Sequence, residues 1–217
     1  MSQVTLRLLR FTYKKLKENL TVSDSKTLFH EQFPYVIPSL FKRIVDEMLV
    51  ELNLLHHQSE FSQDSFFCVG LTETFKDLTN GYEPEKHIKQ LFGALCASTN
   101  FDSTKIEETS LKTIKEYQGK SLEEISDLII KNSPEKIYYS RILFLGIYKI
   151  LSTANDFKEE EDLKKIVEIE KIATKLNLPV TRAEKDISLF KSNIKRFEQA
   201  KELIRETIIS EREKRKK

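Results

Sequence analysis

The sequence predicts an all-α protein, a multi-helix bundle with a long, coiled-coil-like C-terminal helix. The 217 residues include only five Gly and five Pro, whereas strands would need more frequent turns. Apolar residues recur three and four positions apart through most of the chain, which is the spacing of one helix face. Charged residues make up 32% and hydrophobic residues 39% of the sequence, which favours a soluble globular protein over a membrane-spanning one.

Length, net charge and cysteine content limit the number of domains and the possible functions of the protein. A chain of 217 residues predicts one domain, or one domain with an extension. The net charge of +2 gives no strong preference for nucleic acid. Cys68 and Cys96 both lie in apolar stretches and are interpreted as buried free thiols in a reducing compartment. We find neither an apolar run of about 20 residues nor a secretory signal.

Residues 1–20 form a basic, amphipathic N-terminal segment. Leucines and a tyrosine follow helical spacing there, and only one acid, Glu18, accompanies the basic side chains. Such a segment could lie on an anionic membrane surface; the alternatives are a disordered arm or a misassigned start codon. The candidate membrane-surface residues are Arg7, Arg10, Lys14, Lys15 and Lys17.

Residues 21–180 are expected to be a helical body, whose first helices are placed by capping and proline signals. Ser23 or Asp24 would cap a short helix that ends before Pro34. Pro38 would open the next helix. Ser62 or Asp64 would cap the helix after that.

The later body helices carry similar signals. Pro84 would sit in the first turn of a helix through residue 98, and another would run from Ser103 to a stop at Gly119. The "SLEE" stretch at 121–124 is a capping box. Ser133-Pro134 would start an apolar helix through residue 151, and the acidic run at 159–162 suits the N-terminus of the next helix.

The stretch "FKRIVDEMLVELNLLHH" raises the question of a metal or catalytic site. Its apolar positions make one wide helix face, and Glu47 and Glu51 lie mainly elsewhere. Met48, Leu49 and Leu52 are therefore expected to be buried. A di-iron bundle would need Glu-x-x-His, and no acid precedes any of the four histidines by three residues. We expect a core helix with a charged outer face, no metal and no catalytic residues.

Other catalytic signatures are missing as well. The chain has no Gly-rich phosphate loop, no Gly-x-Ser-x-Gly elbow and no Cys-x-x-Cys pair. Gly70 and Gly93 lie inside apolar helices, where glycine costs about 1 kcal/mol relative to alanine. We expect a close helix–helix approach at both glycines rather than a ligand site.

Residues 181–217 are expected to form one long helix with a basic tail. "TRAE" at 181–184 reads as a capping box, and no Pro or Gly follows, so the helix could exceed about 30 residues. A heptad seam runs along it, with a polar interruption at Lys201: Ile187, Phe190, Ile194, Phe197, Lys201, Ile204 and Ile208.

The end of this seam is the candidate partner-binding surface. Its residues are Ile204, Ile208, Lys201 and Arg205. Little chain remains to cover the two isoleucines, so they suggest packing against a partner helix. The alternative is a helix that packs partly on its own core and ends in a solvated tail. A lysine in the seam weakens self-pairing, so we expect a monomer or weak dimer.

Five ordered segments carry a family resemblance. They are "TVSDSKTLFHEQFP", "FKRIVDEMLVELNLLHHQSEF", "FFCVGLTETFKDLTNGYEPEKHIKQLFGALCAS", "YYSRILFLGIYKIL" and "EKDISLFKSNIKRFEQA". Together they resemble the thylakoid formation protein family, also called the photosystem II biogenesis protein family, from about Thr21 to Lys201. One departure is Gln63-Asp64-Ser65, where relatives usually have a Tyr-Asp-Pro-like element; Asp64 can still cap a helix there.

The resemblance implies an all-helical protein that is peripheral to thylakoid membranes. It implies a role in photosystem II biogenesis and repair with the membrane-bound FtsH protease, without enzymatic activity or cofactor. Plant relatives are connected with G-protein sugar signalling. The first 20 residues match no family feature and are short for a plastid transit peptide, which favours a cyanobacterial protein. We expect it on the cytoplasmic side of the thylakoid membrane or in the cytoplasm.

Three function classes follow from these observations. The first is a non-catalytic helical factor that binds the FtsH complex and the photosystem II assembly and repair machinery. The second is a helical metal-binding enzyme. The third, a nucleic-acid binder, rests on ten basic against five acidic residues from Lys191 onward. We expect no nucleic acid, because stacking aromatics are not interleaved with the basic tail.

Overall fold

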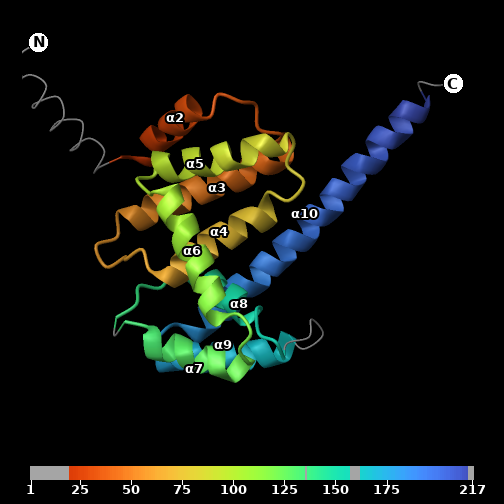
Figure 1. Ribbon diagram of the computed structural model, residues 1–217. Coiled ribbons are helices and arrows are strands. Elements are labelled where there is room, and N and C mark those ends of the chain that lie inside the picture. Colours follow the sequence, from red (N-terminus) through yellow and green to blue (C-terminus); the bar gives the residue numbers. More distant parts are fainter. Residues whose placement is uncertain (1–19, 135, 157–161, 215–217) are drawn as a thin grey trace, which may run out of the picture. The chain divides into compact units, whose positions relative to one another are not determined.

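The computed structural model describes residues 20–134, 136–156 and 162–214 (Figure 1). Over these residues it contains nine α-helices, one short 3₁₀ helix and no strand. The predicted all-α fold with a long C-terminal helix is confirmed. The described residues divide into two compact units. Unit 1 takes in residues 20–63 and 81–109, and unit 2 takes in residues 64–80, 110–134, 136–156 and 162–214.

Unit 1 contains three α-helices, a 3₁₀ helix and the start of a fourth α-helix. They are α2 (Val22–Gln32), α3 (Ser39–His56), η1 (Glu85–His87), α5 (Ile88–Ser98) and the first half of α6 (Ser103–Tyr117). Helix α2 packs on α3 and α5, and α3 packs on α5. Met48, Leu49 and Leu52 are buried, as predicted. The apolar face of α3 is therefore a core face.

The start of α2 differs from the prediction. Thr21, rather than Ser23 or Asp24, is the N-cap: its hydroxyl accepts a hydrogen bond from the Asp24 backbone at 3.2 Å. The Asp24 carboxylate accepts the Thr21 backbone N–H in return, at 3.0 Å. This reciprocal capping box satisfies two amide groups at once. It therefore sets the start of the helix ahead of the other polar side chains nearby.

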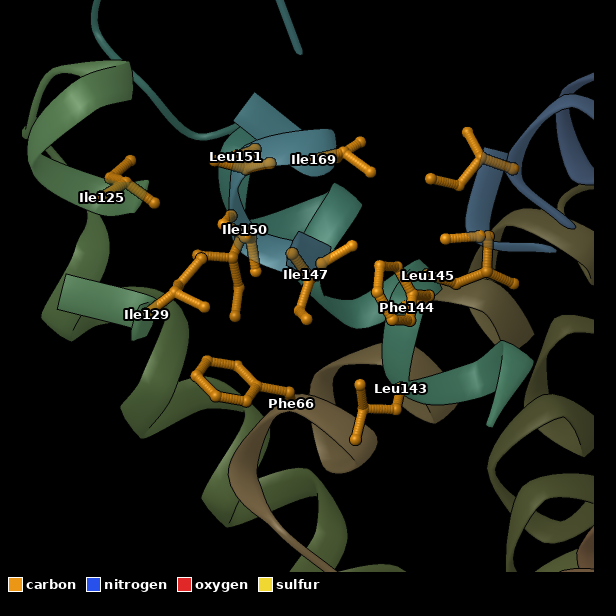
Figure 2. Close-up of a cluster of buried hydrophobic side chains, with 14 of the residues drawn as sticks. Phe66, Ile125, Ile129, Leu143, Phe144, Leu145, Ile147, Ile150, Leu151 and Ile169 are labelled. Atoms are coloured by element: carbon orange, nitrogen blue, oxygen red, sulfur yellow. The ribbon is translucent and has the colours of Figure 1, made fainter. Parts of the chain in front are cut away.

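Unit 2 has a core built by five helices and the second half of α6. The five are α4 (Ser65–Leu78), α7 (Leu122–Asn132), α8 (Arg141–Leu151), α9 (Asp162–Lys175) and α10 (Val180–Lys214). Figure 2 shows buried side chains of α4, α7, α8 and α9 gathered in this core. Helix α8 is central: it contacts α4, α7, α9 and α10. Most of its residues are apolar and buried, so it is covered on most sides.

Helices α4 and α8 cross at two glycines. A Cβ built on Gly70 would overlap the backbone carbonyl of Ile142 and come within 2.9 Å of the Gly146 amide nitrogen. A Cβ on Gly146 would likewise overlap the Phe66 carbonyl. The close approach expected at Gly70 is present. The one expected at Gly93 is wrong, because its nearest neighbour would be the Ser103 hydroxyl at 3.9 Å.

Two helix starts in unit 2 also need correction. Ser133 is the C-cap of α7, and α8 begins only at Arg141, where the Ser140 hydroxyl accepts the Leu143 amide at 3.0 Å. Ser133-Pro134 therefore ends a helix and does not start one. The predicted "TRAE" capping box does not form, because α10 already begins at Val180. The carbonyl of Pro179 accepts the backbone amides of Arg182 and Ala183 at 3.1 and 3.0 Å instead.

Candidate partner-binding surface

The first half of α10 packs against the body of unit 2. Helix α10 contacts α4, α8 and α9. The buried side chains recur four, three and seven positions apart and are Ala183, Ile187, Phe190 and Phe197. This spacing keeps them on one face of the helix. The first half of the predicted seam is therefore an intramolecular contact.

Helix α8 and the first half of α10 are also linked by cation–π contacts. Lys149 of α8 forms an ion pair with Asp77 of α4 and lies 5.6 Å from the centre of the Phe190 ring. Lys191 lies 5.3 Å from the Tyr148 ring centre. Such cation–π contacts favour a fixed helix position when they are partly desolvated.

Tyr139 makes a further link to α10. Its hydroxyl donates to the Asp186 carboxylate at 2.5 Å, and the Arg182 guanidinium lies 4.7 Å from its ring centre. Burial, followed by this hydrogen bond and the Asp186 charge, raises the pKa of Tyr139 well above its usual range. Arg182 and Asp186 of α10 therefore both contact Tyr139.

The second half of α10 exposes apolar side chains. Ile204 is 48% exposed, Leu203 64% and Ile209 49%. In Figure 1 this half extends beyond the other helices of unit 2. It stays helical to Lys214. Because an isolated helix gains little stability from propensity alone, exposed apolar groups there suggest an external contact.

The four candidate partner-binding residues share one face by their spacing. Lys201 is partly exposed and binds both oxygens of Glu198 at 3.0 and 3.1 Å, with its Nζ 5.8 Å from the Phe197 ring centre. Ile204 and Arg205 are exposed. The backbone of Ile208 continues the helix, but its side chain is outside the described part of the chain.

Leu203 and Ile209 were not among the predicted residues. Neither continues the three-and-four spacing of the seam, so the heptad pattern alone passes over them. The available signal was simpler: both are large apolar residues in a strongly charged segment. The exposed apolar side chains are therefore not confined to the predicted seam, and they lie on different sides of the helix.

The five candidate membrane-surface residues, Arg7, Arg10, Lys14, Lys15 and Lys17, lie outside the described residues. The first residue of the described range, Leu20, is buried. Its carbonyl accepts the Asn53 side-chain amide at 2.9 Å, and that amide also donates to the Ser25 hydroxyl at 2.8 Å. Leu20 is therefore anchored to unit 1.

The polar face of α3 makes ordinary surface pairs. Arg43 donates to Glu47 at 2.8 Å, with 87% and 49% of their side chains exposed. At the helix end, burial and the neighbouring His57 lower the pKa of His56.

Within the described residues there is no group of three or more His, Cys, Asp or Glu side chains placed to hold a metal. Nor is any described helix both long and apolar enough to cross a membrane.

Comparison with known proteins agrees with this architecture. The model of the thylakoid formation protein family matches residues 21–217. Protein Thf1 of Prochlorococcus marinus subsp. pastoris (strain CCMP1986 / NIES-2087 / MED4) is 59% identical over 93% of this chain and 100% of its own length. Protein Thf1 of Synechococcus sp. (strain CC9605) is 40% identical, covering 91% of this chain and 93% of the relative.

A solved structure supports the same assignment. The structure of Psb29 at 1.55 Å matches with a TM-score of 0.81 and 27% sequence identity. The match covers 92% of this chain and 100% of that chain. The chain therefore belongs to the thylakoid formation protein family, and its role is in thylakoid formation.

Proposed function

We propose that this chain is a non-catalytic factor for photosystem II biogenesis and repair that binds and supports the FtsH protease complex. Family membership supports the biological setting. The single observation that carries the binding role is the exposure of Leu203, Ile204 and Ile209 on the second half of α10. Burying such side chains against another protein would contribute about 1.5–3 kcal/mol each when burial is complete.

The division of α10 into two halves supports a docking arm. Its first half packs on unit 2 through Ile187, Phe190 and Phe197. This packing fixes the helix, so the second half is offered to a partner already folded. Preorganisation of this kind lowers the entropic cost of binding.

The proposed function includes a site of action at the membrane surface or in the cytoplasm. We place the protein peripherally, at the cytoplasmic face of the thylakoid membrane or in the cytoplasm, acting as a monomer or weak dimer. The basic segment with Arg7, Arg10, Lys14, Lys15 and Lys17 is proposed to contact the anionic membrane surface. The second half of α10, with Ile204, Ile208, Lys201 and Arg205, is proposed to contact FtsH.

Truncation after Gln199 tests the arm. It retains the buried Phe197 and removes the exposed Leu203, Ile204 and Ile209. We expect the thermal midpoint to stay within about 2–4 °C, since few buried contacts are lost. Co-isolation of FtsH from thylakoids should fall strongly.

The control is the substitution Leu189→Ser, which removes another exposed apolar side chain from the packed half of α10. FtsH association should be unchanged in this variant. Full association of FtsH with the truncated protein would place the contact on the helical body and exclude the arm.

A further inference from the structure

The second half of α10 sorts its charges by face. Lys201, Arg205 and Arg212 stand four and seven residues apart, on the same side of the helix as Ile204. Glu198, Glu202 and Glu206 follow one another at intervals of four and form a neighbouring row. Residues three and four apart are neighbours on a helix surface. The side of α10 that carries Ile204 is therefore cationic, and the carboxylates lie beside it.

We propose that this cationic apolar face docks into an apolar groove bordered by carboxylates on a partner protein. The inference rests on the proposed function and specifies the chemistry of the partner surface. Ile204 supplies the apolar contact, at 48% exposure in the isolated chain. The exposed Arg205 and Arg212 supply the charges that select an acidic rim.

Two other occupants fit the charge pattern less well. In a symmetric dimer the same face would meet itself, which would set two cationic faces against each other. An anionic membrane would attract those cations but repel the adjacent row of Glu198, Glu202 and Glu206. Helices that lie on anionic membranes carry mainly Lys and Arg on their polar side. A protein groove can avoid the glutamates, whereas a flat lipid surface cannot.

The test compares two double variants with the same change in net charge. Arg205→Glu with Arg212→Glu reverses the cationic face. Lys195→Glu with Arg196→Glu reverses two exposed cations on other sides of α10. Binding of each full-length variant to the purified FtsH complex is measured at about 0.1 M and about 1 M salt, and circular dichroism checks that α10 remains helical.

We expect the first variant to raise Kd at least about tenfold at the lower salt concentration, and the matched control to change it less than about threefold. The difference should shrink at the higher concentration, because the Debye length falls from about 10 Å to about 3 Å. Equal weakening by both variants would show a net-charge effect and overturn the proposal.

Other outcomes separate this inference from the proposed function. If truncation after Gln199 abolishes FtsH binding while Arg205→Glu with Arg212→Glu does not, the arm is correct and the acidic groove is wrong. If truncation has no effect, the arm itself is wrong. If the charge variant loses binding only to vesicles containing anionic phospholipid, the occupant is a lipid surface and the protein groove is excluded.

Discussion

Leu52 and Glu47 lie on the same helix but have opposite environments. Leu52 is fully buried, whereas the Glu47 side chain is 49% exposed and pairs with an 87% exposed arginine. Leu52→Ala should lower the free energy of unfolding by about 2–5 kcal/mol, because it leaves a cavity in unit 1. Glu47→Gln should cost less than about 1 kcal/mol.

Urea titrations of the two variants measure both values. The assignment of a core face and a solvated face on α3 would fail if Glu47→Gln cost more than Leu52→Ala. Retention of the ranking at high salt would show that packing, rather than the ion pair, carries the difference.

Gly70 provides a second prediction at the residue scale. Gly70→Ala would push a methyl group into the backbone carbonyl of Ile142, which cannot move without displacing α8. We expect a loss of about 1–3 kcal/mol or more, as for overpacked cores. Gly93→Ala is the matched control, because it has room for the methyl group. Removing a helix-interior glycine there should stabilise the protein by about 0.5–1 kcal/mol.

Thermal unfolding followed by circular dichroism distinguishes the two alanine variants, and equal shifts in the midpoint would contradict the crossing described for α4 and α8.

The two glycines also show how much of the helix packing the sequence could predict. It marked Gly70 and Gly93 equally, since both interrupt apolar helices. Only the helix packed opposite decides whether glycine is required. That neighbour, which carries Gly146, comes from a distant part of the chain.

The N-cap of α4 leads to a prediction about how the stability of the protein depends on pH. Asp64 caps α4 by accepting the Phe67 amide at 2.7 Å. Burial nevertheless raises its pKa above the ordinary value of 3.8, outweighing the hydrogen bonds from the Phe67 and Phe66 backbone. Because the folded-state pKa is the higher one, ionised Asp64 costs folding energy above that pKa. The cost disappears as the pH falls from the folded-state pKa to below 3.8.

Asp64→Asn should therefore be as stable as the natural protein at pH 7, or more so, because asparagine caps equally well and carries no charge. Its advantage should shrink as the pH is lowered towards 4. Asp64→Ala should lose about 0.5–2 kcal/mol at both ends of this range. Urea titrations at several pH values measure this, and an Asn variant as unstable at pH 7 as the Ala variant would show that the charge itself stabilises the helix.

Sequence signals located helices more reliably than their ends. The capping box at Ser121–Glu124 forms as predicted. The predicted start at Ser133-Pro134 was wrong, because Ser133 is the C-cap of α7 and α8 begins only after its own N-cap, Ser140. Several polar residues in a row can each cap a helix. The choice among them depends on the tertiary position of the next apolar turn.

At the scale of the whole molecule, the helical periodicity was enough to predict the fold class, because each helix buries a wide apolar face. The seam of α10 was also predicted, and its first half is buried at Ile187, Phe190 and Phe197. Sequence could not show where burial ends along this helix. That boundary depends on how far the rest of unit 2 reaches along the helix.

The membrane role proposed for the N-terminal segment is tested by a deletion that leaves the rest of the chain unchanged. Deletion of residues 1–19 retains Leu20 and its contact with Asn53, so unit 1 should stay folded. We expect binding to anionic vesicles in co-sedimentation to fall at least about tenfold, since basic residues contribute about 1 kcal/mol each near such a surface. Unchanged vesicle binding after deletion would exclude a membrane role for this segment.

Neither unit is a contiguous stretch of chain, because α4 joins unit 2 while the residues on both sides of it belong to unit 1. During synthesis α4 leaves the ribosome well before α8, the helix against which Phe66 and Gly70 pack. The apolar face of α4 therefore stays exposed until α8 has been synthesised. Such exposure favours aggregation or binding by chaperones. Cutting the gene at any single point would likewise leave at least one unit incomplete in both fragments or in one of them.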